Sequence, residues 1–319
     1  MGNINFLFEN TGDFVSLNGD IIDMRRFSPH VLDDGFMDVP VAYEVIRIIR
    51  GVPMFFEDHC ARLNASLAKL GADAETGAGR LRTPIAALLE TNRTANCNVK
   101  IWAARNSGGN LNIFMNINRG FYPPQEYYDN GVPAGLYAHT RDDPNVKRIV
   151  PGFKEKIQAM MDNGGVFEVL LYDFAGRLTE GSRSNLFFSR GGSLYTAPDG
   201  MILKGTIRGH VFDAARSAGI PVVEKCASID EVGLIRTAGG GLRPARQTGA
   251  EAGAAGRDTR PAAFGDNRVD GAFITGTSIG VLPLSNIGGA VLRSAENRLI
   301  RQIMDEYDKI AQDYIQGYL

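Results

Sequence analysis

The chain has 319 residues, 44% of them hydrophobic, which is enough to bury one large core or two medium ones. Its formal net charge of -2 gives no overall attraction for nucleic acid or an anionic membrane, which favours a small-molecule ligand. The three cysteines are too few and too scattered for a disulfide framework or a metal cluster, so we expect neutral thiols. The sequence lacks a signal-peptide pattern and any run approaching the ~18 apolar residues of a membrane span. We therefore expect a cytoplasmic protein of two domains.

Residues 1–130 carry the patterns of a small α+β domain. Asn18-Gly19 is a strong hairpin signal within 14–23, because both residues tolerate a positive φ. Apolar residues recur at helical spacing from Glu57, and Gly71 is suited to end that helix. The other elements expected here are a strand over 42–50 that turns at 51–53 and returns from Met54, a helix over 83–91, and strands over 98–104 and 111–116, joined by a turn at 107–109.

Residues 131–319 are expected to form a larger domain, reached by a proline-containing crossing over 117–140. Pro151 is suited to the first turn of a helix that ends near Asp162. The other expected elements are strands over 168–173, 177–180, 185–189, 193–196, 221–224 and 271–274, and helices over 206–217 and 295–314.

Residues 236–270 differ abruptly from their flanks, being rich in Gly, Ala and Arg and lacking any apolar period. We interpret them as a long loop or a disordered insertion. Their six arginines are suited to an acidic partner, but a solvated loop without function explains them as well. An altered reading frame would also produce such a shift in composition.

Several features together predict a site for a phosphate group. Gly205 leads into a helix, so the N–H groups of Thr206 and Ile207 point outward at the positive end of the helix dipole. The loop at 275–278 offers further backbone and hydroxyl donors, and Arg62 offers a charged fork. Because the sequence has no P-loop and no dinucleotide fingerprint, the phosphate belongs more plausibly to a compact cofactor than to a nucleotide.

A set of motifs resembles the class IV aminotransferases in order and spacing, over nearly the whole chain outside 236–270. These motifs are Tyr43-Glu44-Val45-Ile46-Arg47, His59-Cys60-Ala61-Arg62-Leu63, Glu180-Gly181-Ser182 with Asn185-Leu186-Phe187, Gly205-Thr206-Ile207-Arg208 and Thr275-Gly276-Thr277. The resemblance implies the two-domain fold of pyridoxal-phosphate (PLP) enzymes of fold type IV, in which a small α+β domain joins a larger, barrel-like α/β domain. It also implies a homodimer that completes each pocket.

The resemblance implies that one lysine carries PLP as a Schiff base and shuttles the α-proton of the substrate. Lys147 fits this role, because it lies in an extended segment 21 residues before the expected strand at Glu168. Lys154 and Lys156 are the competitors, but both fall inside an expected helix. Glu180 is expected to pair with the pyridine nitrogen of PLP and keep it protonated.

The remaining site residues are also implied by the resemblance. Tyr43 and Arg105 are the candidates for substrate contacts, and Asn185 is expected to brace its loop rather than to act in catalysis. No metal is expected. The residues expected to bind PLP are Arg62, Glu180, Ser184, Asn185, Gly205, Thr206, Ile207, Gly276, Thr277 and Ser278.

Two departures weaken the assignment of a substrate. Branched-chain members have a tyrosine shortly after the lysine, where residues 148–153 offer no hydroxyl, and D-amino acid members have an Arg-x-His pair that is absent from 100–105. We expect amino transfer between a branched-chain or similar apolar amino acid and a 2-oxo acid such as 2-oxoglutarate. The alternatives are a lyase resembling aminodeoxychorismate lyase, which releases pyruvate, and a non-catalytic scaffold.

Overall fold

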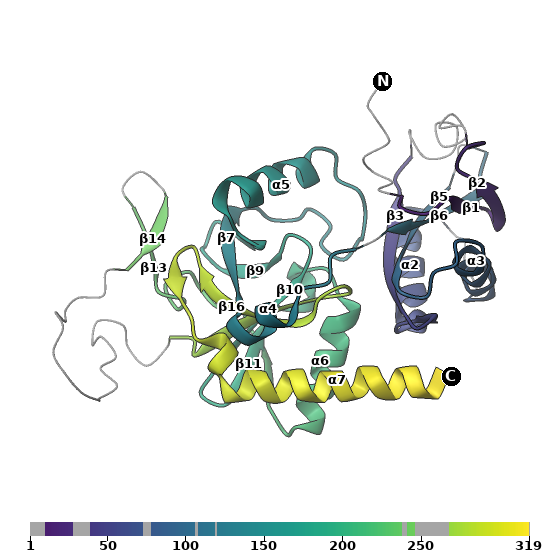
Figure 1. Cartoon of the computed structure of the whole chain (residues 1–319). Coiled ribbons are helices and arrows are strands. Elements are labelled where there is room, and N and C mark those ends of the chain that lie inside the picture. The colour runs from purple at the N-terminus through teal and green to yellow at the C-terminus, as the bar shows by residue number, and fades with distance from the viewer. Residues whose placement is uncertain are drawn as a thin grey trace.

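The computed structural model describes residues 10–27, 39–72, 78–105, 108–118, 120–237, 241–245 and 268–318. Two sheets dominate these residues, one formed before residue 119 and one formed after residue 131 (Figure 1). The domain boundary near residue 130 stays a prediction, although it lies between the two sheets. Among the described residues, no helix is long and apolar enough to cross a bilayer.

The first sheet has six antiparallel strands in the order β2-β1-β6-β5-β3-β4. Two helices cover one face of it and bury one apolar cluster (Figure 1). The other face carries a second cluster around Trp102 and Phe114. The elements are β1 (Phe14–Leu17), β2 (Asp20–Asp23), β3 (Ala42–Ile49), β4 (Val52–Pro53), α2 (Phe56–Lys69), α3 (Ala78–Thr91), β5 (Cys97–Arg105) and β6 (Leu111–Asn118).

The hairpin at Asn18-Gly19, the helix ending before Gly71 and the strand at 42–50 are confirmed. The prediction of a return strand from Met54 is wrong, because the short β4 ends before Met54. Phe55 adopts a φ of 49° and turns the chain into α2. Helix α3 begins at Ala78 rather than at 83, so Pro84 lies inside it and not at its start. The expected turn at 107–109 lies partly outside the described residues.

The second sheet closes into a barrel, because β9 pairs with both β8 and β10. The barrel strands are β7 (Val132–Ala138), β8 (Glu168–Tyr172), β9 (Leu178–Gly181), β10 (Asn185–Arg190), β15 (Gly271–Gly276) and β16 (Gly280–Ile287). β11 (Ser193–Thr196) and β12 (Val222–Glu224) extend the sheet from β10, and β17 (Ala290–Val291) pairs with β16. Apolar side chains fill its interior.

Helices surround the barrel (Figure 1). They are α4 (Gln125–Asn130), α5 (Phe153–Gly164), α6 (Thr206–Ser217) and α7 (Arg298–Tyr318), with the short 3-10 helices η2 (Asp199–Met201) and η3 (Ser294–Glu296). Helices α6 and α7 contribute to one apolar cluster, which includes the stacked rings of Phe187 and Phe273 from the barrel wall.

Four expectations for this half are corrected. The crossing over 117–140 contains the barrel strand β7, and Pro133 lies within it opposite an irregularity in the β16 register. Helix α5 begins at Phe153, because Gly152 adopts a φ of 75° and leaves Pro151 in the preceding turn. Helix α7 begins at Arg298, after η3. The segment 236–270 is not wholly irregular, because β13 (Leu234–Arg236) pairs with β14 (Leu242–Pro244); residues 238–240 and 246–267 of this segment lie outside the described residues.

The cysteines have the neutral character expected of them. Cys60 and Cys97 are buried and Cys226 is half-buried, all as free thiols. Burial raises the pKa of each thiol to about 11.

Candidate active site

One cavity collects most of the side chains singled out by the motifs, and it takes residues from both sheets. The small sheet contributes Tyr43 of β3, and Arg62 comes from the helix α2 that covers it. The lining residues are Tyr43, Arg62, Arg141, Lys147, Arg148, Glu180, Ser182, Arg183, Ser184, Asn185, Leu203, Gly205, Thr206, Ile207, Thr275, Gly276 and Thr277.

Lys147 lies in the segment between β7 and α5, where the chain runs beside the start of β3 in the small sheet. Its carbonyl oxygen accepts a hydrogen bond from the N–H of Tyr43 at 3.0 Å, and its own N–H donates to Ser66 Oγ at 3.2 Å. The neighbouring Arg148 forms an isolated bridge with Ala42, at the start of β3. Lys147 Nζ lies 4.8 Å from the centre of the Tyr43 ring. The lysine backbone is therefore fixed on both sides while its amine faces the cavity.

The surroundings of Lys147 raise the fraction of its amine that is neutral. Burial lowers its pKa from 10.5 to about 8, with Arg62 and Arg141 acting in the same direction against the two carboxylates Glu44 and Glu180. A shift of this size raises the neutral fraction at pH 7 by about two orders of magnitude. The neutral amine is the nucleophilic form, so this lysine is the one suited to attack a carbonyl carbon.

Glu180 lies at the end of β9 and is almost fully buried. Its Oε1 accepts a hydrogen bond from Arg141 Nε at 2.7 Å, and its Oε2 accepts one from the N–H of Leu203 at 3.3 Å. Burial raises the pKa of Glu180, and the ion pair with Arg141 opposes that rise. Arg141 was not anticipated from the sequence. It also donates to the carbonyl of Ser182 at 3.0 Å and so fixes the loop beside Glu180.

The far end of the cavity has the features of an anion site. Helix α6 begins there with Gly205 as its N-cap, and no side chain caps it. The hydroxyls of Thr206 and Thr275 are buried without a hydrogen-bond partner. Unpaired backbone N–H groups and orphaned hydroxyls at one helix N-terminus favour a bound anion. Thr275 belongs to the predicted loop, but no local pattern distinguishes it from Thr277.

The approach of Asn185 to Gly205 explains the glycine in this motif. Asn185 Nδ2 donates to the carbonyl of Leu203 at 2.8 Å, two residues before Gly205. A Cβ atom on Gly205 would lie 1.9 Å from Asn185 Oδ1. With Asn185 in this position, the loop passes the asparagine without a clash because residue 205 has no side chain.

The buried carboxylate of Glu44 positions Arg62 in the wall of the cavity. Its Nε and Nη2 atoms donate to the two oxygens of Glu44, each at 2.7 Å, and His59 Nδ1 lies 2.8 Å from Glu44 Oε2. Arg62 Nη1 donates to the carbonyl of Lys204 at 3.2 Å. The pKa of Glu44 is held well below its usual range, because the Arg62 and His59 contacts outweigh its burial.

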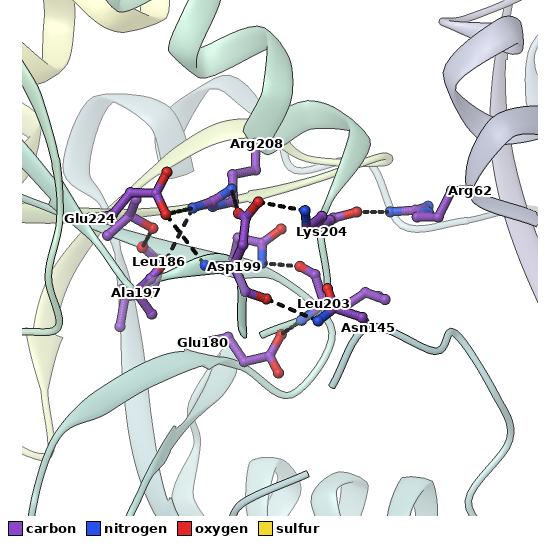
Figure 2. Close-up of polar contacts among 12 residues, drawn as sticks. Arg62, Asn145, Glu180, Leu186, Ala197, Asp199, Leu203, Lys204, Arg208 and Glu224 are labelled. Carbon is purple, nitrogen blue, oxygen red and sulfur yellow. Dashed lines mark hydrogen bonds and ion pairs between the residues drawn. The ribbon is translucent and has the colours of Figure 1, made fainter. Parts of the chain in front are cut away.

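A second network fixes the loop between β11 and α6 (Figure 2). Arg208 of α6 donates to Asp199 Oδ1 at 2.7 Å and to the carbonyl of Ala197 at 3.1 Å. Asp199 also pairs with Lys204, and its carbonyl accepts from Asn145 Nδ2 at 3.1 Å. Asn145 precedes Lys147 by two residues, so the network ties the lysine segment to the loop that forms the anion site.

Three expected site residues have other contacts. The Ser184 hydroxyl donates to buried Glu168 at 2.7 Å, although Ser184 lines the cavity. Ser278 does not line it, and its hydroxyl accepts from Asn98 Nδ2 at 2.8 Å. Arg105 is exposed at the end of β5, bonds the carbonyl of Gly109 at 2.9 Å and does not line the cavity.

Besides Lys147, Lys100 also lies near the ring of Tyr43. Strand pairing sets Tyr43 opposite Trp102, and Lys100 lies on the same face of β5 two residues earlier. Lys100 Nζ lies 4.1 Å from the centre of the Trp102 ring and 5.5 Å from that of Tyr43. Of the two basic residues of β5, Lys100 therefore lies nearer to the tyrosine than the expected substrate contact Arg105, and neither lines the cavity.

These features fit PLP. The α6 N-terminus with the unpaired hydroxyls of Thr206 and Thr275 suits the phosphate, and buried Glu180 suits a protonated ring nitrogen. Lys147, with its lowered pKa, lines the same cavity and suits the aldehyde. The chain thus offers one group for each reactive part of the cofactor.

Known proteins are similar to this chain over most of its length. A D-alanine aminotransferase from Bacillus licheniformis is 25% identical over 242 residues, which cover 68% of this chain and 80% of the relative. A protein from Methanocaldococcus jannaschii, named as a branched-chain-amino-acid aminotransferase, is 24% identical over 314 residues, covering 93% and 96% of the two chains.

Solved structures share the fold. A branched-chain amino acid aminotransferase from Thermobaculum terrenum in its PLP form aligns with a TM-score of 0.73 at 19% identity, covering 96% of this chain and 95% of that one. The Escherichia coli branched-chain enzyme aligns with a TM-score of 0.74 at 17% identity, covering 94% and 95%. The profile of the family described as amino-transferase class IV matches residues 41–287. The chain therefore belongs to the class IV aminotransferases, which are PLP-dependent enzymes.

Proposed function

We propose that this enzyme transfers the amino group of a branched-chain or similar apolar amino acid to a 2-oxo acid such as 2-oxoglutarate, with Lys147 as the reactive lysine. The observation that carries the proposal is the position of Lys147 in one cavity with Glu180 and the α6 N-terminus. Both a D-alanine and a branched-chain enzyme are among its relatives, and the latter aligns over 93% of this chain.

PLP, when bound, supplies an aldehyde for the amino group and a ring that accepts electrons from the substrate α-carbon. Arg62, the N–H groups of Thr206 and Ile207, and the hydroxyls of Thr206 and Thr275 would hold its phosphate. Gly276 and Thr277 lie in the same wall of the cavity.

Lys147 would move the proton at the α-carbon of the substrate. With a pKa near 8, its amine can accept a proton and return it at neutral pH without a large free-energy penalty in either direction. The Tyr43 ring, 4.8 Å from Nζ, limits the directions that the amine can take. Glu180 would keep a proton on the ring nitrogen, and its ion pair with Arg141 keeps the carboxylate oriented.

The small sheet would supply the substrate contacts. Tyr43 lines the catalytic cavity, and buried Trp102 packs against it with ring centres 6.1 Å apart. Lys100 Nζ lies 4.1 Å from the Trp102 ring centre and 5.5 Å from that of Tyr43. An apolar side chain can pack on the Tyr43 ring while the substrate carboxylate pairs with a cation.

We also propose that the enzyme is a homodimer. Light scattering, which measures the molar mass in solution, tests this directly.

The experiment is an amino-transfer assay with the PLP-loaded enzyme. We expect glutamate to form from 2-oxoglutarate and L-leucine, L-isoleucine or L-valine. Lys147→Ala is expected to lower kcat by about 10³-fold, because positioned acid–base catalysis contributes on that order. Lys156→Ala is the matched control and should keep full activity, because Lys156 lies on α5 and bonds Tyr137 outside the cavity.

Other products would contradict the proposal in defined ways. Activity with D-alanine but none of the three L-amino acids would assign the opposite handedness. Release of pyruvate from aminodeoxychorismate without a 2-oxo acid would assign the lyase reaction. Unchanged activity in Lys147→Ala would remove the lysine from the chemistry.

A further inference from the structure

A second cavity, of about 300 Å³, lies between the small sheet and α7, and we call it the α7 cavity. It shares Ile207 and Thr277 with the catalytic cavity, but Lys147 and Glu180 are not among its lining residues. Its lining residues are Arg47, Ile49, Met54, Phe55, His59, Ile207, Thr277, Tyr307, Asp308, Ala311, Gln312 and Ile315. A volume of ~300 Å³ is at the lower end for small-molecule sites, so an occupant would be small.

The α7 cavity presents opposite charges from two parts of the chain. Arg47 comes from β3, where its Nη1 donates to the carbonyl of Ser278 at 3.4 Å. Asp308 comes from α7, and burial together with Asp305 raises its pKa while Arg47 opposes that rise. A carboxylate can pair with the guanidinium while an ammonium group pairs with Asp308. This separation of charge matches a zwitterion.

His59 adds an acceptor that has no partner. It is 1% exposed, and its Nδ1 is paired with Glu44 at 2.8 Å, which places the proton on Nδ1 because the carboxylate can only accept. Burial lowers the pKa of His59, so the ring is neutral at pH 7. Its Nε2 is buried and unpaired. An unpaired buried acceptor in a cavity wall favours an occupant with an N–H donor.

Apart from Thr277 and Gln312, the rest of the wall is mostly apolar. Ile49, Met54, Phe55 and Ile315 line the cavity together with the ring of Tyr307. Phe55 is itself fixed by a stacked contact with His210, with ring centres 3.7 Å apart. Such a wall gains free energy by covering an aliphatic side chain, at ~25 cal/mol per Å² of apolar surface.

We propose that the α7 cavity binds a free amino acid with an apolar side chain, at a site separate from the catalytic cavity. The ligand carboxylate faces Arg47, its ammonium group faces Asp308 and His59, and its side chain packs on the apolar wall. The site is next to the catalytic machinery, because His59 and Arg62 share the carboxylate of Glu44. An amino acid bound there contacts the support of the phosphate-binding residues without entering the catalytic cavity.

The test is equilibrium dialysis of radiolabelled L-leucine against the PLP-loaded enzyme after borohydride reduction, which closes the catalytic site to amines. Two variants alter the α7 cavity: Ala311→Trp fills it, and Asp308→Asn removes its negative charge with little change in shape. Lys309→Trp is the matched control, because Lys309 is exposed on α7 and does not line the cavity.

We expect saturable binding of leucine to the reduced wild type and to Lys309→Trp. Ala311→Trp and Asp308→Asn should each weaken it by about tenfold or more, as expected when the space is filled or the ammonium group of the ligand loses its charged partner. No saturable binding to the wild type, or binding retained in both cavity variants, would overturn the proposal.

Competition tests the requirement for both charges. Isoamylamine lacks the carboxylate of leucine and 4-methylpentanoate lacks its ammonium group, so each should compete far more weakly than unlabelled leucine. Equal competition by either compound would contradict the zwitterion. Failure of the proposed function is seen separately in the amino-transfer assay of the unreduced enzyme, whereas the cavity variants report on leucine binding to the reduced enzyme.

Discussion

Glu44 is the residue on which the position of Arg62 depends. Both of its oxygens bind the guanidinium, and the pair is almost fully enclosed. Because the pKa of Glu44 is lowered in the folded protein, this stabilisation is present at neutral pH and is lost only as the pH falls into the acid range. Glu44→Gln removes the charge and leaves Arg62 without its anionic partner.

We expect Glu44→Gln to weaken PLP binding by about tenfold and to lower the free energy of unfolding by ~3 kcal/mol, as when one member of a buried ion pair is removed. Spectroscopic titration with PLP and thermal unfolding measure the two effects. Glu296→Gln is the control, because Glu296 pairs with Arg293 at an exposed position and does not line the cavity. Equal PLP affinities in the two variants would show that Glu44 does not position Arg62.

Among single residues, those with a specific chemistry could be predicted best from the sequence. Lys147, Glu180 and Arg62 were predicted from their motifs, and the structure brings all three to one cavity. Arg141 could not be predicted, because its ion pair with Glu180 joins residues 39 positions apart and no local pattern signals it. Lys100 could have been preferred to Arg105, because only Lys100 shares the strand face of the residue paired with Tyr43.

The loop from β11 to α6 shows how an element depends on one glycine. Gly205 has a φ of -71°, which any residue can adopt, so its requirement is purely steric. In Gly205→Ala the new methyl group would lie 1.9 Å from Asn185 Oδ1, and either the loop or the asparagine must move. Either movement displaces the N–H groups of Thr206 and Ile207 from the anion site.

We expect Gly205→Ala to lower stability by ~1–3 kcal/mol, as for overpacked sites, and to weaken PLP binding. Gly209→Ala is the matched control, since a Cβ there meets nothing within 4 Å and alanine is the better helix former. Thermal unfolding of both variants, with and without PLP, measures the difference. A Gly205→Ala protein as stable as Gly209→Ala, with unchanged PLP affinity, would contradict the steric account.

The elements that sequence patterns predicted are those with local signals. Turn residues such as Asn18-Gly19 set the first hairpin, and Gly71 and Gly219 follow the ends of their helices. Strand β7 was missed because Pro133 lies in it, and a proline inside a strand normally argues against a central position. The register irregularity opposite Pro133 in β16 accommodates the missing donor, which no local pattern reveals.

On the scale of the whole molecule, the catalytic cavity exists because two units are held against each other. Near the lysine, the segment around Lys147 pairs with the start of β3. At the other end, α7 reaches α2, where Tyr314 Oη donates to Glu57 at 2.9 Å and accepts from the N–H of Phe56 at 3.0 Å (Figure 1). Neither contact has a sequence signal, because their partners lie about a hundred or more residues apart.

The closed barrel likewise could not be predicted from local patterns. Hairpin signals gave its antiparallel pairs, but closure depends on the contact between β9 and β10 and on the parallel strands β7, β8 and β16. The barrel was expected only because the motifs resemble a family with this fold. Solved structures that share the fold align over 94% to 97% of the chain.

The most direct test of the whole account is borohydride reduction of the PLP-loaded enzyme, followed by peptide mapping. We expect the visible band of the cofactor to disappear and the reduced cofactor to be recovered on the peptide that contains Lys147. Recovery on Lys154 or Lys156, or a protein that retains no cofactor after reduction, would contradict the assignment of Lys147 and with it the proposed mechanism.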